Sequence, residues 1–122
     1  MNKFERLNVY NEAHKLVLAI YKHTSRFPKS ELFGLTSQLR RSAVSIVANT
    51  VEGNSRNSKK EYIQFLYIAI GSLEETKYHL LLAKDLSYIT LQDYNNVQNQ
   101  AENVGKMLNG LMKYWKNISH TS

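Results

Sequence analysis

The chain contains no cysteine, a single proline and five glycines among its 122 residues. The absence of cysteine excludes disulfide bonds, thiolate nucleophiles and cysteine-ligated zinc. With one proline and few glycines, little in the sequence forces a break in the backbone, which favours long helices. Long apolar runs are also missing, because LVLAIY and FLYIAI are far shorter than the ~18 residues that span a bilayer. The N-terminal stretch MNKFERLNVYNEAHK has no apolar signal region, so we expect a cytoplasmic protein with no membrane partner.

Sequence signatures of catalysis are missing as well. Di-iron bundles use Glu-x-x-His pairs, but the residues three positions before the four histidines are Asn11, Ile20, Thr76 and Asn117. There is no Gly-x-Ser-x-Gly turn and no glycine-rich phosphate loop before a lysine. We therefore expect no enzyme, no catalytic residue, no metal and no cofactor.

The residues that are present are typical of a globular protein. Hydrophobic residues make up 43% of the chain and charged residues 21%, and the length suits one domain over residues 1–122. Hydrophobic periodicity and capping residues predict four helices, at about residues 5–25, 31–53, 59–87 and 91–117. Short connections between long helices favour an all-α, up-down-up-down antiparallel four-helix bundle.

The helix ends carry recognisable signals. Pro28 is expected to end the first helix, and Ser30 to cap the second. Gly53 is expected to end the second helix in the left-handed conformation. Ser58 and Thr90 each precede an acidic residue at the third helical position, a pattern typical of N-caps. The first half of the third helix, YIQFLYIAIGSL, is apolar on nearly every side, which suggests contact with another subunit.

Positive charge is concentrated in the middle of the chain. The net charge is +6, and the segment from Arg26 to Lys60 holds seven basic residues but only two acidic ones. Clustered cations favour a polyanionic partner, since phosphate contacts release counterions. The basic residues that would contact a nucleic-acid backbone are Arg40, Arg41, Arg56, Lys59 and Lys60. The same charges are also compatible with a solvated rim that keeps the protein soluble.

Three residues near the end of the second helix suggest structural roles. Glu52 lies in the last turn, where the helix dipole disfavours negative charge, so we expect a salt bridge with Arg56 or another base. Asn49 is interpreted as a buried polar residue bonded across a helix interface. Gly53 is expected to end the helix, and the serines and alanines of residues 42–50 let another backbone approach closely.

One long run carries a family resemblance: FPKSELFGLTSQLRRSAVSIVANTVEGNSRNSKKEYIQFLYIAIGSLEET. Its most telling parts are residues 27–28, 35–41, 49, 52–53, 61–62, 65–66 and 71–75. Together they resemble the signature of the four-helix-bundle family of 23S rRNA intervening-sequence proteins, over about residues 5–115. Some members of that family are encoded within insertions in large-subunit ribosomal RNA genes.

The resemblance has several implications. It implies an antiparallel four-helix bundle that assembles as a ring-shaped homopentamer, with no established enzymatic activity. The fold is also similar to the accessory variability protein of diversity-generating retroelements, a basic pentamer that binds nucleic acid and a reverse transcriptase. The resemblance thus implies a homo-oligomer with RNA or DNA, or another protein, as its partner.

Two hypotheses follow from these observations. In the first, the protein is a non-catalytic oligomer that associates with nucleic acid, RNA above all, through its basic surface. In the alternative, it is an oligomeric protein-interaction scaffold in which Arg40 and Arg41 pair with carboxylates such as Glu52, Glu61, Glu74 or Glu75. The exposure of the two arginines distinguishes the hypotheses.

Overall fold

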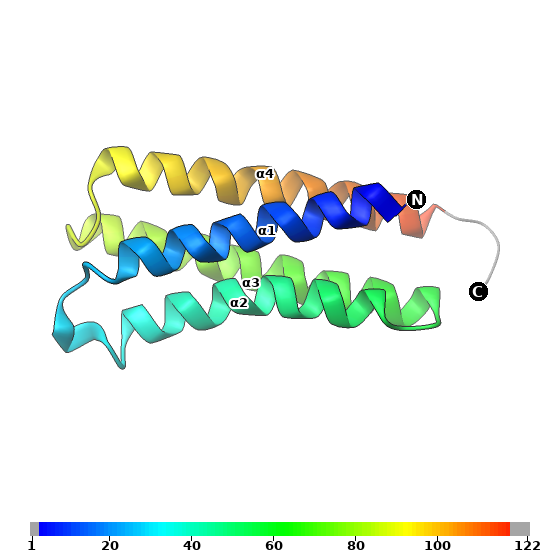
Figure 1. Ribbon diagram of the computed structural model, residues 1–122, viewed down its shortest axis with the longest axis horizontal. Helices are drawn as coiled ribbons and strands as arrows, with labels where there is room; N and C mark the ends of the chain where they lie inside the picture. The colour runs from blue at the N-terminus through cyan, green and yellow to red at the C-terminus, as the bar shows by residue number, and fades with distance from the viewer. Residues whose placement is uncertain (1–2, 118–122) are drawn as a thin grey trace.

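The computed structural model describes residues 3–117, with side chains from residue 8 onward. Over residues 3–117 the chain forms four long α-helices and one short 3-10 helix, without a strand: α1 (Lys3–Thr24), η1 (Lys29–Glu31), α2 (Leu35–Asn54), α3 (Lys59–Asp85) and α4 (Leu91–Lys116). The helices run alternately up and down along one elongated bundle (Figure 1). The all-α four-helix bundle predicted from the sequence is confirmed.

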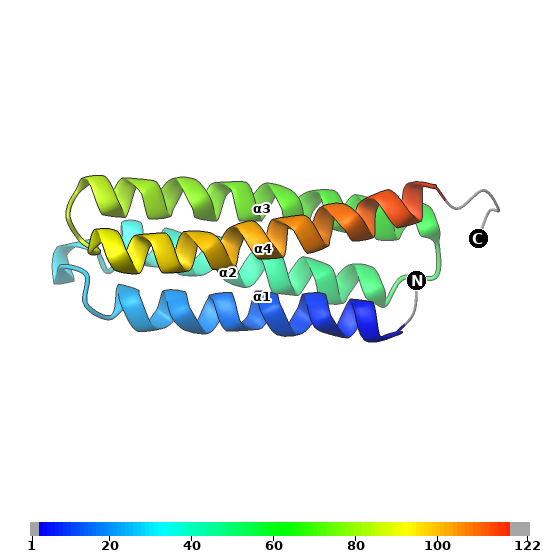
Figure 2. The same cartoon turned by 90° about the horizontal axis from the view of Figure 1, so that it is seen from above.

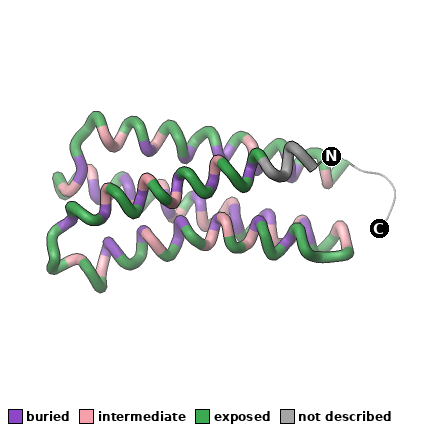
Figure 3. The backbone as a smooth tube through the Cα atoms, viewed as in Figure 1, coloured by how far each residue is buried: buried purple, intermediate pink, exposed green. Residues whose placement is uncertain are grey.

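Each helix packs against two neighbours. Helix α2 lies between α1 and α3, and α4 closes the bundle by packing against the same two helices. The view turned by 90° shows α1 and α3 on opposite sides of the bundle (Figure 2). Buried residues recur every three or four positions, so they face the centre of the bundle while exposed residues face outward (Figure 3). The largest fully buried side chains include Leu16, Ile20, Leu39, Ile46, Leu66, Leu73, Leu80, Val97 and Leu108.

Two helix starts agree with the sequence signals. The Ser58 hydroxyl accepts a hydrogen bond from the Glu61 backbone N–H at 3.1 Å, and the Thr90 hydroxyl accepts one from Asp93 N–H at 3.1 Å. Each bond satisfies one amide in the first turn, which otherwise has no partner within the helix. The predicted N-caps of α3 and α4 are therefore confirmed.

The start of α2 differs from the prediction, which placed the cap at Ser30. The chain first forms η1 and then passes through Gly34, so that α2 begins only at Leu35. The group that satisfies the first turn is the carboxylate of Glu31, which accepts a hydrogen bond from Leu35 N–H at 3.0 Å. Because the helix starts later, Leu32 is half exposed instead of lying on the apolar face of α2.

The role predicted for Gly53 in ending α2 is also wrong. The helix continues through Asn54, and no glycine among the described residues has a positive φ. Gly53 instead permits close packing, since a Cβ at this position would lie 2.8 Å from the Cβ of Phe65 on α3. The small residue at position 53 permits the close approach of the two backbones, a role that was not predicted for it from the sequence.

A ladder of hydroxyl groups joins α2 to α3. Ser45 Oγ and Ser72 Oγ form a hydrogen bond at 2.8 Å, and Thr76 Oγ1 lies 2.8 Å from Ser42 Oγ. Such short side chains bring the helices close together and satisfy each other's polar groups inside the bundle. This pairing confirms that the small-residue segment of α2 lies against another helix.

Candidate nucleic-acid interface

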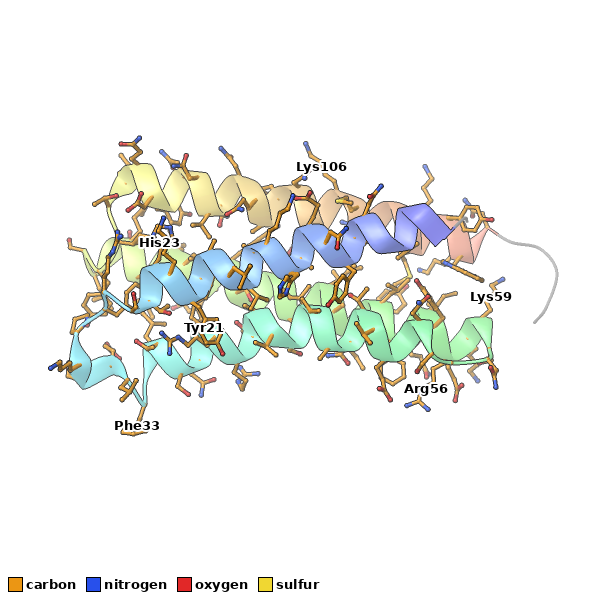
Figure 4. All side chains as sticks on the ribbon, viewed as in Figure 1. Tyr21, His23, Phe33, Arg56, Lys59 and Lys106 are labelled. Carbon is orange, nitrogen blue, oxygen red and sulfur yellow. The ribbon has the colours of Figure 1, made fainter. Side chains whose placement is uncertain are left out.

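The five predicted cationic residues lie in two separate places. Arg56 lies in the turn between α2 and α3, and Lys59 and Lys60 begin α3, at the end of the bundle where Figure 4 labels Arg56 and Lys59. Arg40 and Arg41 lie in the first half of α2. Fourteen helical positions separate Arg40 from Asn54, the last residue of α2, which corresponds to about 21 Å along the bundle. The five residues therefore do not form one continuous site on a single chain.

In the turn, Arg56 is held against α2 and α3. Its backbone N–H donates to the Gly53 carbonyl at 3.1 Å, and its guanidinium forms a salt bridge with the carboxylate of Glu52. The guanidinium carbon also lies 5.0 Å from the centre of the Phe65 ring. The predicted Glu52–Arg56 pair is therefore present, and it offsets the unfavourable position of Glu52 at the helix end.

A small pocket opens beside this turn. Its volume is about 100 Å³, and its lining residues are Asn54, Arg56, Asn57, Ser58, Lys59, Tyr62 and Trp115. The rings of Tyr62 and Trp115 form its floor, with centroids 4.9 Å apart. Pockets for cofactors and drug-sized ligands measure ~300–1,000 Å³, so this one suits a few waters or a small anionic group. Its lining is more apolar than polar, and the side chains of Arg56 and Lys59 contribute positive charge at its edge.

Two further cations reach the same end of the bundle from α4. Lys113 and Lys116 lie in the last turn of α4, which runs antiparallel to α3 and so ends beside the start of α3. The Lys116 ammonium lies 4.7 Å from the centre of the Tyr67 ring. We define the basic end cluster as Arg56, Lys59, Lys60, Lys113 and Lys116. The sequence prediction missed the last two because they lie more than fifty positions from the turn.

Arg40 lies between α1 and α2. Its Nε donates a hydrogen bond to Thr24 Oγ1 at 2.8 Å, and its guanidinium lies 4.6 Å from the centre of the Tyr21 ring. Both partners are neutral, so the positive charge of Arg40 is not cancelled by these contacts. Arg40 is half-buried, with one side against the helices.

Arg41 has an acidic partner. It forms a salt bridge with Glu75 on α3 and also donates a hydrogen bond to Gln38 at 3.0 Å. Glu75 in turn lies 3.1 Å from Nε2 of His79. One of the two arginines therefore faces a carboxylate, as the scaffold hypothesis expects, whereas the other does not.

Asn49 stabilises α2 from within. Its amide nitrogen donates to the Ser45 carbonyl at 2.8 Å and lies 3.0 Å from Ser45 Oγ, both in the same helix. The expected bond across a helix interface is therefore not direct. Asn49 reaches α3 only through Ser45, whose hydroxyl bonds to Ser72.

Neither a metal-binding cluster nor a membrane-spanning helix is found among the described residues. Among residues 8–117, no group of three or more His, Asp or Glu side chains is placed to hold a metal ion. None of the helices in the described part of the chain is long and apolar enough to cross a membrane. Two of the described histidines lie near a carboxylate: His23 is 3.8 Å from Asp93, and His79 is part of the Arg41–Glu75 contact between α2 and α3.

Comparisons with known proteins agree with this architecture. A family model described as 23S rRNA-intervening sequence protein matches residues 5–110. A similar solved structure is that of a protein of unknown function from the S23 ribosomal protein family of Bacteroides thetaiotaomicron, with a TM-score of 0.83 and 26% identity. That match covers 89% of this chain and 98% of the other.

None of the curated proteins matches the chain. Neither description names an enzymatic activity. Because the family model spans most of the sequence, this chain belongs to the 23S rRNA-intervening sequence protein family.

Proposed function

We propose that this protein is a non-catalytic, homo-oligomeric four-helix bundle that associates with RNA through its basic end cluster. The observation that carries the proposal is the gathering of five cations at one end of the bundle, from the turn between α2 and α3, the start of α3 and the end of α4. The acidic residues nearby are Glu52 in the last turn of α2 and Glu61 in the first turn of α3, so positive charge dominates there. The proposed partner would place the protein in the cytoplasm.

Charge alone can supply binding of this kind. Each Lys or Arg that neutralises a phosphate releases counterions, which gives affinity with little dependence on sequence. The pocket beside Arg56 and Lys59 adds a small recess, with a volume of about 100 Å³, that two cationic side chains help to line. The family description refers to 23S rRNA, which supports RNA over DNA as the partner. In a homopentamer, the end clusters would repeat around a ring and produce a stronger collective field.

The test is a titration of labelled 12-nucleotide RNA at several salt concentrations. We expect the logarithm of the affinity to fall linearly with the logarithm of salt. A variant with Arg56→Glu, Lys59→Glu and Lys60→Glu should bind more weakly, with a salt slope shallower by about 2. The matched control reverses three exposed cations elsewhere, Lys15, Lys22 and Lys106, and has the same net charge. Equal weakening by both variants would mean that net charge alone matters and that the cluster is not the site.

The alternative function is an oligomeric protein-interaction scaffold. It is favoured by the Arg41–Glu75 pair and by the outer face of α3, where Tyr67, Ile68 and Tyr78 are 51%, 51% and 59% exposed. Apolar residues at this exposure are commonly covered by another chain. Measuring the mass of the purified protein tests the expected pentamer, and assaying for nucleic acid that copurifies at low salt separates the two functions. An oligomer that carries no nucleic acid and binds none would favour the scaffold.

A further inference from the structure

Phe33 is the most exposed large apolar side chain of the described residues. Its exposed fraction is 92%, and the neighbouring Leu32 is 50% exposed. Figure 4 shows Phe33 pointing away from the helices, at the end of the bundle opposite Arg56 and Lys59. Burying a phenylalanine side chain normally stabilises a protein, so a ring held almost wholly in water suggests a binding role.

The backbone that presents Phe33 is firmly held. The Glu31 carboxylate accepts one hydrogen bond from Leu35 N–H at 3.0 Å and another from the Tyr88 hydroxyl at 2.9 Å. The Gly34 N–H donates to the Glu31 carbonyl at 3.0 Å, and the lack of a side chain at Gly34 leaves room for the carboxylate. Because these bonds fix the chain on both sides of Phe33, the ring cannot enter the core without breaking them.

Apart from Leu32, the exposed side chains near Phe33 in the sequence are polar or cationic. Arg26 and Lys29 are exposed basic residues shortly before it, and Ser30, Ser37 and Gln38 are exposed as well. Phe33 follows Lys29 by four positions, and part of that segment is helical, so their Cα atoms lie less than ~14 Å apart. Protein-binding hot spots are typically surrounded by other residues that exclude water, whereas charged residues are depleted from the centres of such interfaces. A ring whose exposed neighbours other than Leu32 are cations and polar side chains fits a different partner.

We propose that Phe33 is a stacking platform for an unpaired base of single-stranded nucleic acid, with Arg26 and Lys29 contacting the adjacent phosphates. The inference rests on the proposed function and adds a preference for single strands at a second place on the molecule. Exposed aromatic rings bind single strands because every base has a flat face that can stack on them. Bases in a duplex are already paired and stacked, so the Phe33 ring adds nothing to duplex binding.

The decisive variants are Phe33→Leu and Phe33→Trp. Leucine keeps the apolar character and loses the flat ring, whereas tryptophan keeps stacking and adds a fluorescent reporter. With labelled 12-nucleotide oligouridylate, Phe33→Leu should bind about 5- to 150-fold more weakly than the native protein. With a 12-base-pair RNA duplex, it should bind as the native protein does. Phe33→Trp should retain single-strand affinity, and its additional emission should be quenched on binding.

Leu32→Ala is the matched control, because it removes an exposed apolar side chain from the same turn without removing a ring. It should bind both RNAs as the native protein does, and thermal melting checks that every variant is folded. If Phe33→Leu retains single-strand affinity, the stacking inference is overturned while the proposed function stands. If the native protein binds neither RNA, both are overturned. Equal losses from Phe33→Leu and Leu32→Ala would identify an apolar docking surface and would also overturn stacking.

Discussion

Gly53→Ala is a direct test of the close contact between α2 and α3. Alanine is the better helix former, and replacing a helical glycine by alanine normally stabilises a protein by ~0.5–1 kcal/mol. At Gly53 the added Cβ would lie 2.8 Å from the Cβ of Phe65 and 3.5 Å from the Tyr62 carbonyl oxygen. Carbon atoms in proteins pack best at ~3.5–4.0 Å, so α2 and α3 must move apart. The Phe65 Cβ is attached to the backbone of α3 and cannot rotate out of the way.

The two effects have opposite signs, and their sizes decide the outcome. Forcing an extra methyl group into a packed interface costs ~1–3 kcal/mol. After the gain in helix propensity is subtracted, Gly53→Ala should destabilise the fold by about 0.5–2 kcal/mol. For a domain of this size, that lowers the melting temperature by roughly 2–8 °C.

Gly110→Ala provides the matched control, since a Cβ at Gly110 on α4 meets no atom within 4 Å. It should stabilise the protein by ~0.5–1 kcal/mol. Urea denaturation at one fixed protomer concentration measures both changes without interference from assembly. If Gly53→Ala stabilises the protein as much as Gly110→Ala does, the contact between the two backbones is not as close as we describe.

Three further predictions concern single hydrogen-bonded groups. Thr90→Ala should destabilise the fold by ~1 kcal/mol in urea denaturation, because Asp93 N–H loses its partner, and Thr90→Ser should restore most of the loss. Thr76→Val should cost ~1–3 kcal/mol by the same measurement, since it leaves Ser42 Oγ buried with fewer partners. The Leu35 amide, and then the Tyr88 hydroxyl, hold the pKa of Glu31 below its ordinary 4.5. The Glu31 carboxylate therefore stabilises the fold above pH 4.5, and this stabilisation is lost as the pH falls through its lowered pKa. In Glu31→Gln, a plot of melting temperature against pH should therefore fall less steeply on the acid side.

Most of the fold could be predicted because helix periodicity and capping are local properties. The stripe on α4 and the caps at Ser58 and Thr90 depend on residues within four positions of each other. The start of α2 could not be predicted in this way. The partner of Leu35 N–H is Glu31, and Glu31 is held in turn by Tyr88, which is 57 positions away. A contact of that separation is decided by tertiary packing, so the local preference of Ser30 for an N-cap did not prevail.

The candidate site was harder to predict than the fold. The sequence prediction groups neighbouring cations into one site, but α2 separates Arg40 from the turn that holds Arg56 by about 21 Å along the bundle. Residues that are distant in the sequence can also lie close together. Lys113 and Lys116 are far from Arg56 in the sequence but lie at the same end of the bundle as the turn between α2 and α3. The partner of Arg41, Glu75, was one of four carboxylates considered, and only the packing of α2 on α3 selects it. The exposure of Phe33 follows from the late start of α2 and could not be seen before that start was known.

The separation of the two proposed contact regions has a consequence for RNA length. Helix α2 has 20 residues and spans about 30 Å between the Phe33 turn and the basic end cluster. Successive nucleotides in a stacked strand rise ~3.4 Å, so about nine are needed to reach from one region to the other. A 5-nucleotide RNA can therefore occupy only one region of a chain, whereas a 12-nucleotide RNA can bridge both and gains from the high effective concentration of the second contact. Affinity should rise steeply near nine nucleotides, and Phe33→Leu or the Arg56/Lys59/Lys60 reversal should each abolish the step. A smooth increase with length that neither variant changes would mean that a single strand does not run along α2.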